Sequence, residues 1–174
     1  CKAMGNYITI DSPGLRRRNR DLQEKIGQIL TGELAKLLSL GEDDCVLVVG
    51  LGNWNATPDA LGPRVTSKLM VTRHLHAFIP EELAGGLRPV AALSPGVLGL
   101  TGIETAEIIR GVVEHVKPKV VICIDALAAR NVERIGTTIQ LADTGINPGA
   151  GIGNNRKALN EATLGVPVVG IGVP

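Results

Sequence analysis

Two aspartates in this sequence follow short, fully apolar segments. Asp59 lies in the stretch VLVVGLGNWNATPDALGP, on the loop after the run 46–50, and Asp125 directly follows the run VVICI at 120–124. In an open parallel sheet, the loops after neighbouring strands meet at the carboxyl edge, where ligands bind. Two facing carboxylates cannot both ionise cheaply, so one keeps its proton while the other can act as a base on water. If the two strands are neighbours, this pair can hydrolyse an amide without a nucleophilic side chain.

Each aspartate also has a plainer interpretation. The tripeptide Thr57-Pro58-Asp59 is typical of a helix start, where a carboxylate simply stabilises the free N–H groups. Asp125 closes a run so apolar that we expect its side chain to have a partner. In the catalytic interpretation, Asp59 is the base, because the helix end stabilises its anion. Asp125 is then the acid, because burial and the neighbouring charge raise its pKa.

Three polar side chains and one glycine-rich segment are candidates for supporting this pair. Asn53 and Asn55 share the first loop, and Arg130 follows the second strand closely enough to bind an acidic group of a substrate. The segment 146–155, which includes Gly151, offers backbone N–H groups that can stabilise an oxyanion. A closed turn and a solvated surface charge are the alternative interpretations of the asparagines and of the arginine.

A third aspartate, Asp143, precedes Thr144 and Gly145 in a pattern that is similar to the motif of pepsin-like proteases. Those enzymes are all-β proteins that need two such motifs, and this chain has one among many helix signals. We therefore interpret Asp143 as a turn residue or a supporting residue.

Other chemical motifs do not fit. The loop Gly50-Leu-Gly52-Asn-Trp has no third glycine at dinucleotide spacing, and the sequence contains no G-x-x-x-x-G-K-[ST], G-x-S-x-G, C-x-x-C or H-E-x-x-H. His74 and His76 are best interpreted as a surface or helix-edge pair. We therefore predict that the protein needs neither a metal nor another cofactor.

The hydrophobic periodicity predicts an α/β domain. Apolar residues at helical spacing predict a helix within 19–40 and another after a capping box at 101–104, ending before Pro118. Continuous apolar runs predict strands; they lie at 45–50, 119–124 and 166–171, with further candidates at 87–93 and 137–142. We expect one domain over residues 1–174, with three layers, a mostly parallel central sheet and helices on both faces.

Composition narrows the possible partners and the cellular compartment. A formal charge of +1 over 174 residues gives no broad field for nucleic acid or an anionic membrane, and no apolar stretch is long enough to span a bilayer. Three scattered cysteines indicate a reducing, cytosolic interior. The first residue is Cys1 and the last is Pro174, which suggests that both ends were trimmed from a longer protein.

Several blocks of the sequence together resemble the germination proteases of spore-forming bacteria; they are VVGLGNWNATPDALGP, VTRHL, LRPVAALSPGVLGLTGIET, ICIDALAAR and DTGINPGAGIGNNRKALNEATLGVPVVGIGVP. This resemblance implies an atypical endopeptidase, made as a zymogen, that degrades small acid-soluble spore proteins at germination. It implies a homotetramer in the cytoplasm of the spore core. By motif, the proposed catalytic aspartates fall on Asp59 and Asp125.

Two alternatives stay open at this point. The first block is also similar to the loop of hydrogenase-maturation endopeptidases, which bind a metal with a carboxylate at the position of Asp59, although their histidine ligand has no clear counterpart here. The chain could also be a non-catalytic module whose glycine-rich loops bind an anion or a nucleotide.

Overall fold

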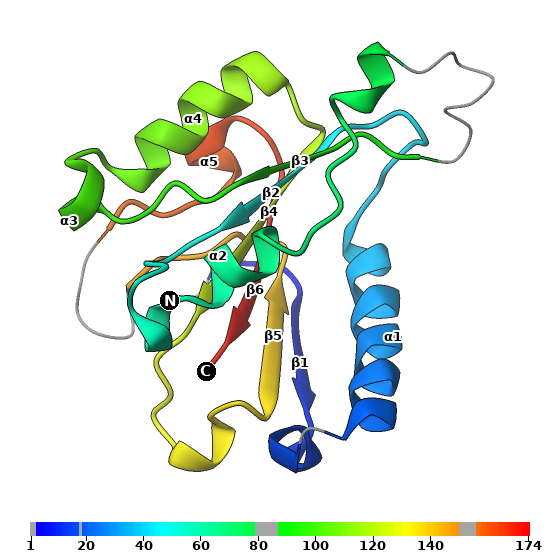
Figure 1. The fold of residues 1–174 in the computed structure, drawn as a ribbon, viewed down its shortest axis with the longest axis vertical. Helices are drawn as coiled ribbons and strands as arrows, with labels where there is room; N and C mark the ends of the chain where they lie inside the picture. The colour runs from blue at the N-terminus through cyan, green and yellow to red at the C-terminus, as the bar shows by residue number, and fades with distance from the viewer. Residues whose placement is uncertain (1–2, 18, 79–86, 150–155) are drawn as a thin grey trace.

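The computed structural model describes residues 3–17, 19–78, 87–149 and 156–174, and within them the strands form one six-stranded sheet in the order β1-β5-β6-β4-β2-β3 (Figure 1). The strands are β1 (Tyr7–Asp11), β2 (Val46–Gly50), β3 (Val90–Leu93), β4 (Val120–Ala126), β5 (Thr138–Ala142) and β6 (Val168–Val173). Strands β3, β2, β4 and β6 pair in parallel, and β5 and β1 add antiparallel pairs at one side. The predicted mostly parallel α/β sheet is therefore confirmed.

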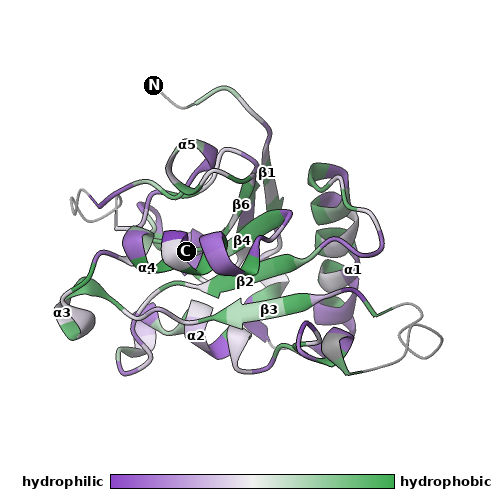
Figure 2. Ribbon diagram, turned by 90° about the horizontal axis from the view of Figure 1, so that it is seen from above, coloured by the Kyte–Doolittle hydropathy of each residue, from purple (hydrophilic) through white to green (hydrophobic). Residues whose placement is uncertain are grey.

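Helices cover both faces of this sheet, as Figure 1 shows. The α-helices are α1 (Arg20–Leu37), α2 (Leu61–Thr66), α3 (Leu98–Thr101), α4 (Thr105–Val116) and α5 (Glu161–Leu164). Residues of α4 and α5 pack with Leu47 and Val49 of β2 on one face, whereas leucines of α1 pack with Val46 and Val48 on the other. This alternation follows from the two-residue period of a strand and makes the three predicted layers. The central strands β2 and β4 are mostly hydrophobic (green in Figure 2), as a sheet covered on both faces requires.

The ends of the two long helices follow local chemistry. The side chain of Asn19 accepts a hydrogen bond from the N–H of Leu22 and so caps the start of α1. Lys117 adopts a left-handed conformation (φ 49°) that ends α4 just before Pro118. The capping box predicted at 101–104 is wrong, because Thr101 is the last residue of α3 and its hydroxyl accepts from the N–H of Ile103. Glu104 is the N-cap of α4, without a side-chain cap.

Strand β1 was not among the predicted strands. Its sequence, YITID, is short and its side chains are mostly exposed, so it carries little apolar signal. It is held by antiparallel pairing with β5, from Tyr7 beside Ala142 to Asp11 beside Thr138. Among the described helices, none is long and apolar enough to cross a membrane.

Candidate active site

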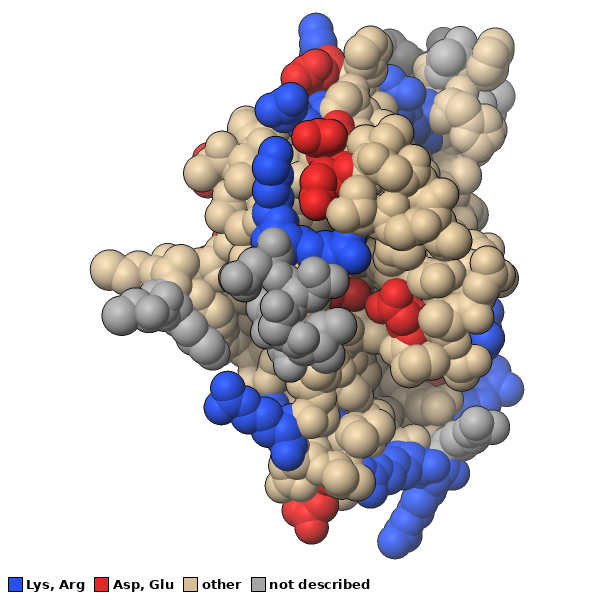
Figure 3. Space-filling model, turned by 90° about the vertical axis from the view of Figure 1, so that its left-hand side faces the viewer, with Lys and Arg blue, Asp and Glu red and all other residues tan. Residues whose placement is uncertain are grey.

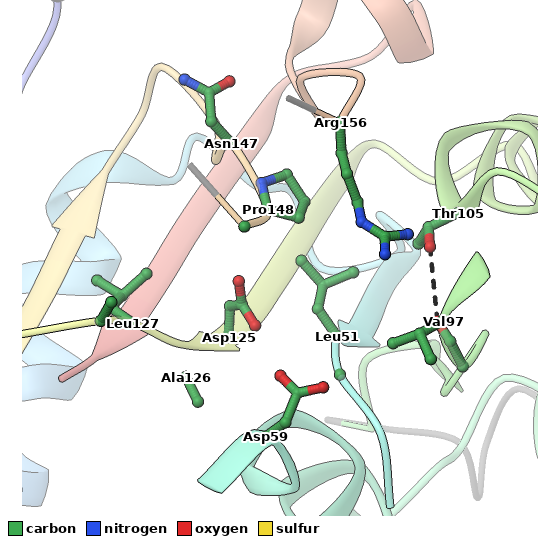
Figure 4. A pocket seen from close by; sticks show the side chains of 14 residues that line it. Leu51, Asp59, Val97, Thr105, Asp125, Ala126, Leu127, Asn147, Pro148 and Arg156 are labelled. Atoms are coloured by element: carbon green, nitrogen blue, oxygen red, sulfur yellow. Dashed lines mark hydrogen bonds between the residues drawn. The ribbon is translucent and has the colours of Figure 1, made fainter. Parts of the chain in front are cut away.

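The carboxyl ends of β2 and β4 meet as the parallel topology requires. The two strands are hydrogen-bonded neighbours in which Gly50 lies beside Ile124, and the N–H of Leu51 donates to the Ile124 carbonyl at 2.8 Å. A pocket of about 160 Å³ lies at this edge, and Asp59 and Asp125 both line it (Figure 4). The structure therefore brings the two predicted catalytic aspartates together.

Asp59 is held by the backbone of the loop that leads to it. It ends the 3-10 helix η2 (Thr57–Asp59), in which Pro58 occupies the first turn and Ala56, rather than the expected Thr57, is the N-cap. The N–H of Asn53 donates to Asp59 Oδ2 at 2.8 Å and to the Asp59 carbonyl at 3.0 Å. The loop thus fixes the position of Asp59.

Gly52 makes this loop conformation possible. Its φ of 113° is strained for any residue with a side chain, and a Cβ atom at this position would overlap the carbonyl oxygen of Asp59. The first glycine-rich loop is thus explained by a tight backbone turn around Asp59, without any phosphate.

Asp125 is buried at the end of β4, with only 5% of its surface exposed. Burial and, to a smaller extent, the nearby charge of Asp59 raise its pKa, a hydrogen bond from the backbone of Ala126 opposes them, and together they move the pKa from 3.8 to about 6. Near pH 6, both the protonated and the ionised form of Asp125 are therefore populated.

The segment that follows β5 crosses β6 and forms one wall of the pocket. Gly145 adopts φ 82°, and Ile146 forms a two-way backbone bridge with Leu159. The loop crosses β6 so closely that a Cβ atom at Gly170 would lie 2.8 Å from the carbonyl oxygen of Gly145. This path places Asn147, Pro148 and Gly149 on the wall of the pocket.

Comparison with known proteins assigns the family. A model of the germination protease family matches residues 1–174. The chain belongs to the germination protease family. It is 57% identical over 173 residues to the germination protease of Clostridium tetani, covering 99% of this chain and 54% of that protein. Identity to that of Caldanaerobacter subterraneus subsp. tengcongensis is also 57%, over 99% of this chain and 53% of the relative. Identity to that of Bacillus velezensis is 56%, over 99% of this chain and 48% of the relative. The chain thus spans about half the length of these relatives.

In this member of the germination protease family, the asparagines predicted to support the site serve its first loop. The backbone of Asn53 binds Asp59, and its side-chain oxygen accepts from the N–H of Asn55 at 2.9 Å. Asn55 itself is exposed. Arg130 is also exposed and is not one of the described residues that line the pocket. Gly151 lies outside the described residues, whereas Gly149 of the same segment reaches the pocket.

Asp143 lies away from the aspartate pair. Strand β5 runs antiparallel to β6, so its last residue leads to the edge of the sheet opposite the pocket. There Asp143 accepts hydrogen bonds from the backbone and side chain of Asn6, at 2.8 and 2.7 Å. It borders a separate hollow with Lys119 and Pro167, which precede β4 and β6. The structure therefore gives Asp143 a role in fixing the N-terminal segment.

Among the residues of the pocket that were not predicted from the sequence, two have polar side chains that can bind a ligand. Thr105, the first residue of α4, is 8% exposed, and Arg156 follows the glycine-rich loop. The signal for Arg156 was its position directly after that loop. No periodicity marks it, because it belongs to neither a helix nor a strand.

The histidines predicted as a helix-edge pair lie at the short 3-10 helix η3 (Leu75–Ala77), with His74 as its N-cap and His76 inside it. Within the described part of the chain, no group of three or more histidine, cysteine, aspartate or glutamate side chains is placed to hold a metal ion.

Proposed function

We propose that this chain carries the catalytic site of an endopeptidase that initiates the degradation of small acid-soluble spore proteins during germination. Membership of the germination protease family supports the reaction class. The observation that carries the proposal is a buried carboxyl group, Asp125, whose pKa is raised to about 6 by burial and by the charge of Asp59 in the same pocket.

In the proposed mechanism, Asp59 accepts a proton from a water molecule held between the two carboxyl groups. The resulting hydroxide attacks the carbonyl carbon of the scissile peptide bond. Asp125 donates its proton to the carbonyl oxygen or to the amide nitrogen, and the C–N bond breaks once the nitrogen has received a proton from the pair. Proton exchange within the pair then restores its starting state. This division of roles follows the environments of the two residues, because Asp59 accepts a backbone hydrogen bond and Asp125 is desolvated.

A single acid or base contributes about 10²–10⁴-fold to a rate, so the pair needs help at the carbonyl oxygen. Gly149 is our candidate for this help, since its backbone borders the pocket at the start of the glycine-rich loop. A backbone N–H aimed at a developing oxyanion contributes about 10²–10³-fold in comparable enzymes.

For the whole protein, we infer a zymogen that assembles as a homotetramer in the cytoplasm of the spore core. The resemblance to the family supports these features, and the modest net charge of +1 is compatible with self-association.

Substitution of each aspartate tests the proposed function. In the full-length protein, Asp59→Asn and Asp125→Asn should each leave the circular dichroism spectrum unchanged and reduce cleavage of a purified small acid-soluble spore protein by at least about 10²-fold. Asp143→Asn is the matched control and should keep most of the activity, because Asp143 lies at the other edge of the sheet. Full activity in either pair variant would disprove the mechanism. A folded wild-type protein that binds the substrate without cleaving it would favour a binding module.

A further inference from the structure

Helix α4 carries two apolar stripes, and the core beneath it accounts for one of them. Ala106, Ile109 and Val113 are buried in that core. A second stripe lines an open hollow of about 550 Å³ on the outside of the helix; its apolar members are Ile103, Ile108, Val112 and Val116. A helix that is apolar on two sides is normally covered on both. The outer face of α4 is therefore suited to contact with another protein surface.

The two ends of this outer face carry side chains of opposite type. Glu107 lies in the first turn of α4 and His115 in its last turn, and both line the hollow. Nδ1 of His115 lies 2.9 Å from the carbonyl oxygen of Gly111, so a second group can bind the ring through Nε2. Glu107 pairs with Lys157 at 3.6 Å, but both side chains are more than half exposed and such a pair contributes little. The face thus has a carboxylate at one end and an imidazole at the other.

This arrangement is complementary to a second copy of itself. Glu107 and His115 lie four residues before and after Gly111, which is about 6 Å along the helix axis in each direction. A two-fold axis brings residue i of one protomer to residue j of its partner, and j to i. Two α4 helices packed antiparallel, with the axis level with Gly111, therefore place each Glu107 opposite the partner's His115.

The side chains between these two ends fit such a contact. Ile108 and Val112 of each protomer fill the space between the helices and set their separation, which is about 8–10 Å for packed helices. A carboxylate bonded to an imidazolium at each end adds a charge-assisted hydrogen bond. The contact is thus apolar at its centre and polar at its rim, as protein interfaces are.

The distribution of charge favours a partner of mixed charge. Figure 3 shows acidic and basic side chains interspersed on the face that it draws, and the formal net charge of the chain is +1. Steering of a strongly charged partner needs a broad field of one sign. A second copy of this chain matches an apolar face with one acid and one imidazole better than such a partner does.

We propose that the outer face of α4 is a two-fold interface between two copies of this chain, in which Glu107 of each protomer binds His115 of the partner subunit. This inference rests on the proposed self-association and is independent of the proposed proteolysis. In a homotetramer with two-fold symmetry, this contact is one of the isologous interfaces that hold the four chains together.

Cysteine pairing tests the geometry. Glu107 and His115 lie about 12 Å apart along one helix, whereas a disulfide needs Cα atoms within about 7 Å, so the pair cannot be bridged inside one chain. In the full-length protein, the double variant Glu107→Cys/His115→Cys should form a covalent dimer under mild oxidation, visible on a non-reducing gel. Each single variant should not, because the two-fold axis keeps identical residues about 12 Å apart. Absence of the dimer in the double variant, or equal yields in the single variants, would overturn the geometry.

The mass of the assembly tests the surface itself. Ile108→Glu in the full-length protein should halve the mass measured by light scattering at micromolar concentration, because it buries a charge in the contact. The control Ile29→Glu should leave the mass unchanged, since Ile29 is an exposed isoleucine of α1; neither isoleucine belongs to a core cluster of the described residues.

Charge reversal tests the pairing. His115→Glu places two carboxylates opposite each other and should raise the dissociation constant of the assembly by at least about 10-fold. Adding Glu107→Arg should restore assembly. If the double variant dissociates as readily as His115→Glu, the two side chains do not meet.

The measurements on the wild type separate this inference from the proposals on which it draws. A wild type that is a monomer contradicts the self-association and this surface with it. A wild type that assembles, together with Ile108→Glu of unchanged mass, contradicts only the surface. Cleavage of a substrate is a separate readout, so its loss in the aspartate variants with assembly intact bears only on the proteolysis.

Discussion

At Asp125, function and stability oppose each other. The side chain is buried at the end of an apolar strand, and the Asp59 carboxylate lies in the same pocket. A carboxyl group with a raised pKa in the folded state costs stability at any pH where the unfolded chain would be ionised. An uncharged residue at this position would be more stable, and the proposed catalytic role gives a reason for the carboxyl group.

We predict that Asp125→Asn stabilises the fold at neutral and alkaline pH. The pKa of Asp125 rises from 3.8 in the unfolded chain to about 6. Below pH 3.8 both states are protonated and no penalty exists; the penalty grows between these values and is complete above pH 6. Each pKa unit corresponds to about 1.4 kcal/mol, so the free energy of unfolding should rise by up to about 3 kcal/mol at pH 8 and by nothing at pH 3.

Urea unfolding at several pH values measures this effect. Asp43→Asn, at an exposed aspartate, is the control and should show no such dependence. If Asp125→Asn destabilises the protein equally at every pH, the carboxylate has a structural role and the account of its burial fails.

The two aspartates could be predicted from the sequence because each follows a short apolar run that reads as a strand. Arg156 could not, because its position depends on where the returning loop crosses β6. That path is fixed by long-range contacts of Gly145 with Leu159 and Gly170, to which no local pattern corresponds.

At the scale of elements, the backbone of α2 packs directly against the backbone of the sheet, at Gly62 of the helix and Gly50 of β2. A Cβ atom at Gly50 would overlap the carbonyl of Gly62, and one at Gly62 would overlap backbone atoms of Leu51 and Ile124. These contacts bring the start of α2 directly onto the ends of β2 and β4. Because η2 leads straight into α2, they also set the position of Asp59.

We therefore predict that Gly62→Ala destabilises the protein and displaces Asp59. Overpacking against backbone costs about 1–3 kcal/mol, and proteolysis should fall as well. Gly111→Ala is the matched control, since Gly111 also lies inside a helix but has open space around it. It should stabilise the protein by up to about 1 kcal/mol, as alanine favours a helix more than glycine does. Equal effects of the two substitutions in urea unfolding would contradict this packing argument.

The apolar runs were predictable as strands, including the weaker candidates at 87–93 and 137–142, which correspond to β3 and β5. The runs at 45–50, 119–124 and 166–171 correspond to β2, β4 and β6, although β4 and β6 begin and end one or two residues later than expected. Strand β1 was not predicted, because it is stabilised by contacts that its own sequence does not reveal. It pairs with β5, which is distant in sequence, and its Ile10 packs against α1.

At the scale of the whole molecule, we predict proteolysis that is independent of metal. A catalytic zinc site uses three protein ligands, and within the described residues Asp59 and Asp125 have no third donor to complete one. Dialysis against a chelator should therefore leave the rate of cleavage unchanged. Loss of activity that a single divalent ion restores would favour a mechanism like that of the hydrogenase-maturation endopeptidases.

We also predict that the full-length protein is a homotetramer. Along α4, the exposed Ile103 adjoins an apolar hollow over Ile108 and Val112, a surface that assembly can bury. Light scattering at micromolar concentration should give four times the mass of one chain. A monomer under these conditions would refute the assembly.

The pH dependence of kcat/KM tests the catalytic pair most directly, because it reports the ionisation of the free enzyme. The account predicts a bell-shaped profile for cleavage of a small acid-soluble spore protein by the wild type. Its alkaline limb should lie near pH 6, where the pair loses the proton that Asp125 donates, and fall tenfold per pH unit. The two apparent pKa values belong to the coupled pair. A rate that stays constant from pH 5 to pH 8 would contradict catalysis by Asp59 and Asp125.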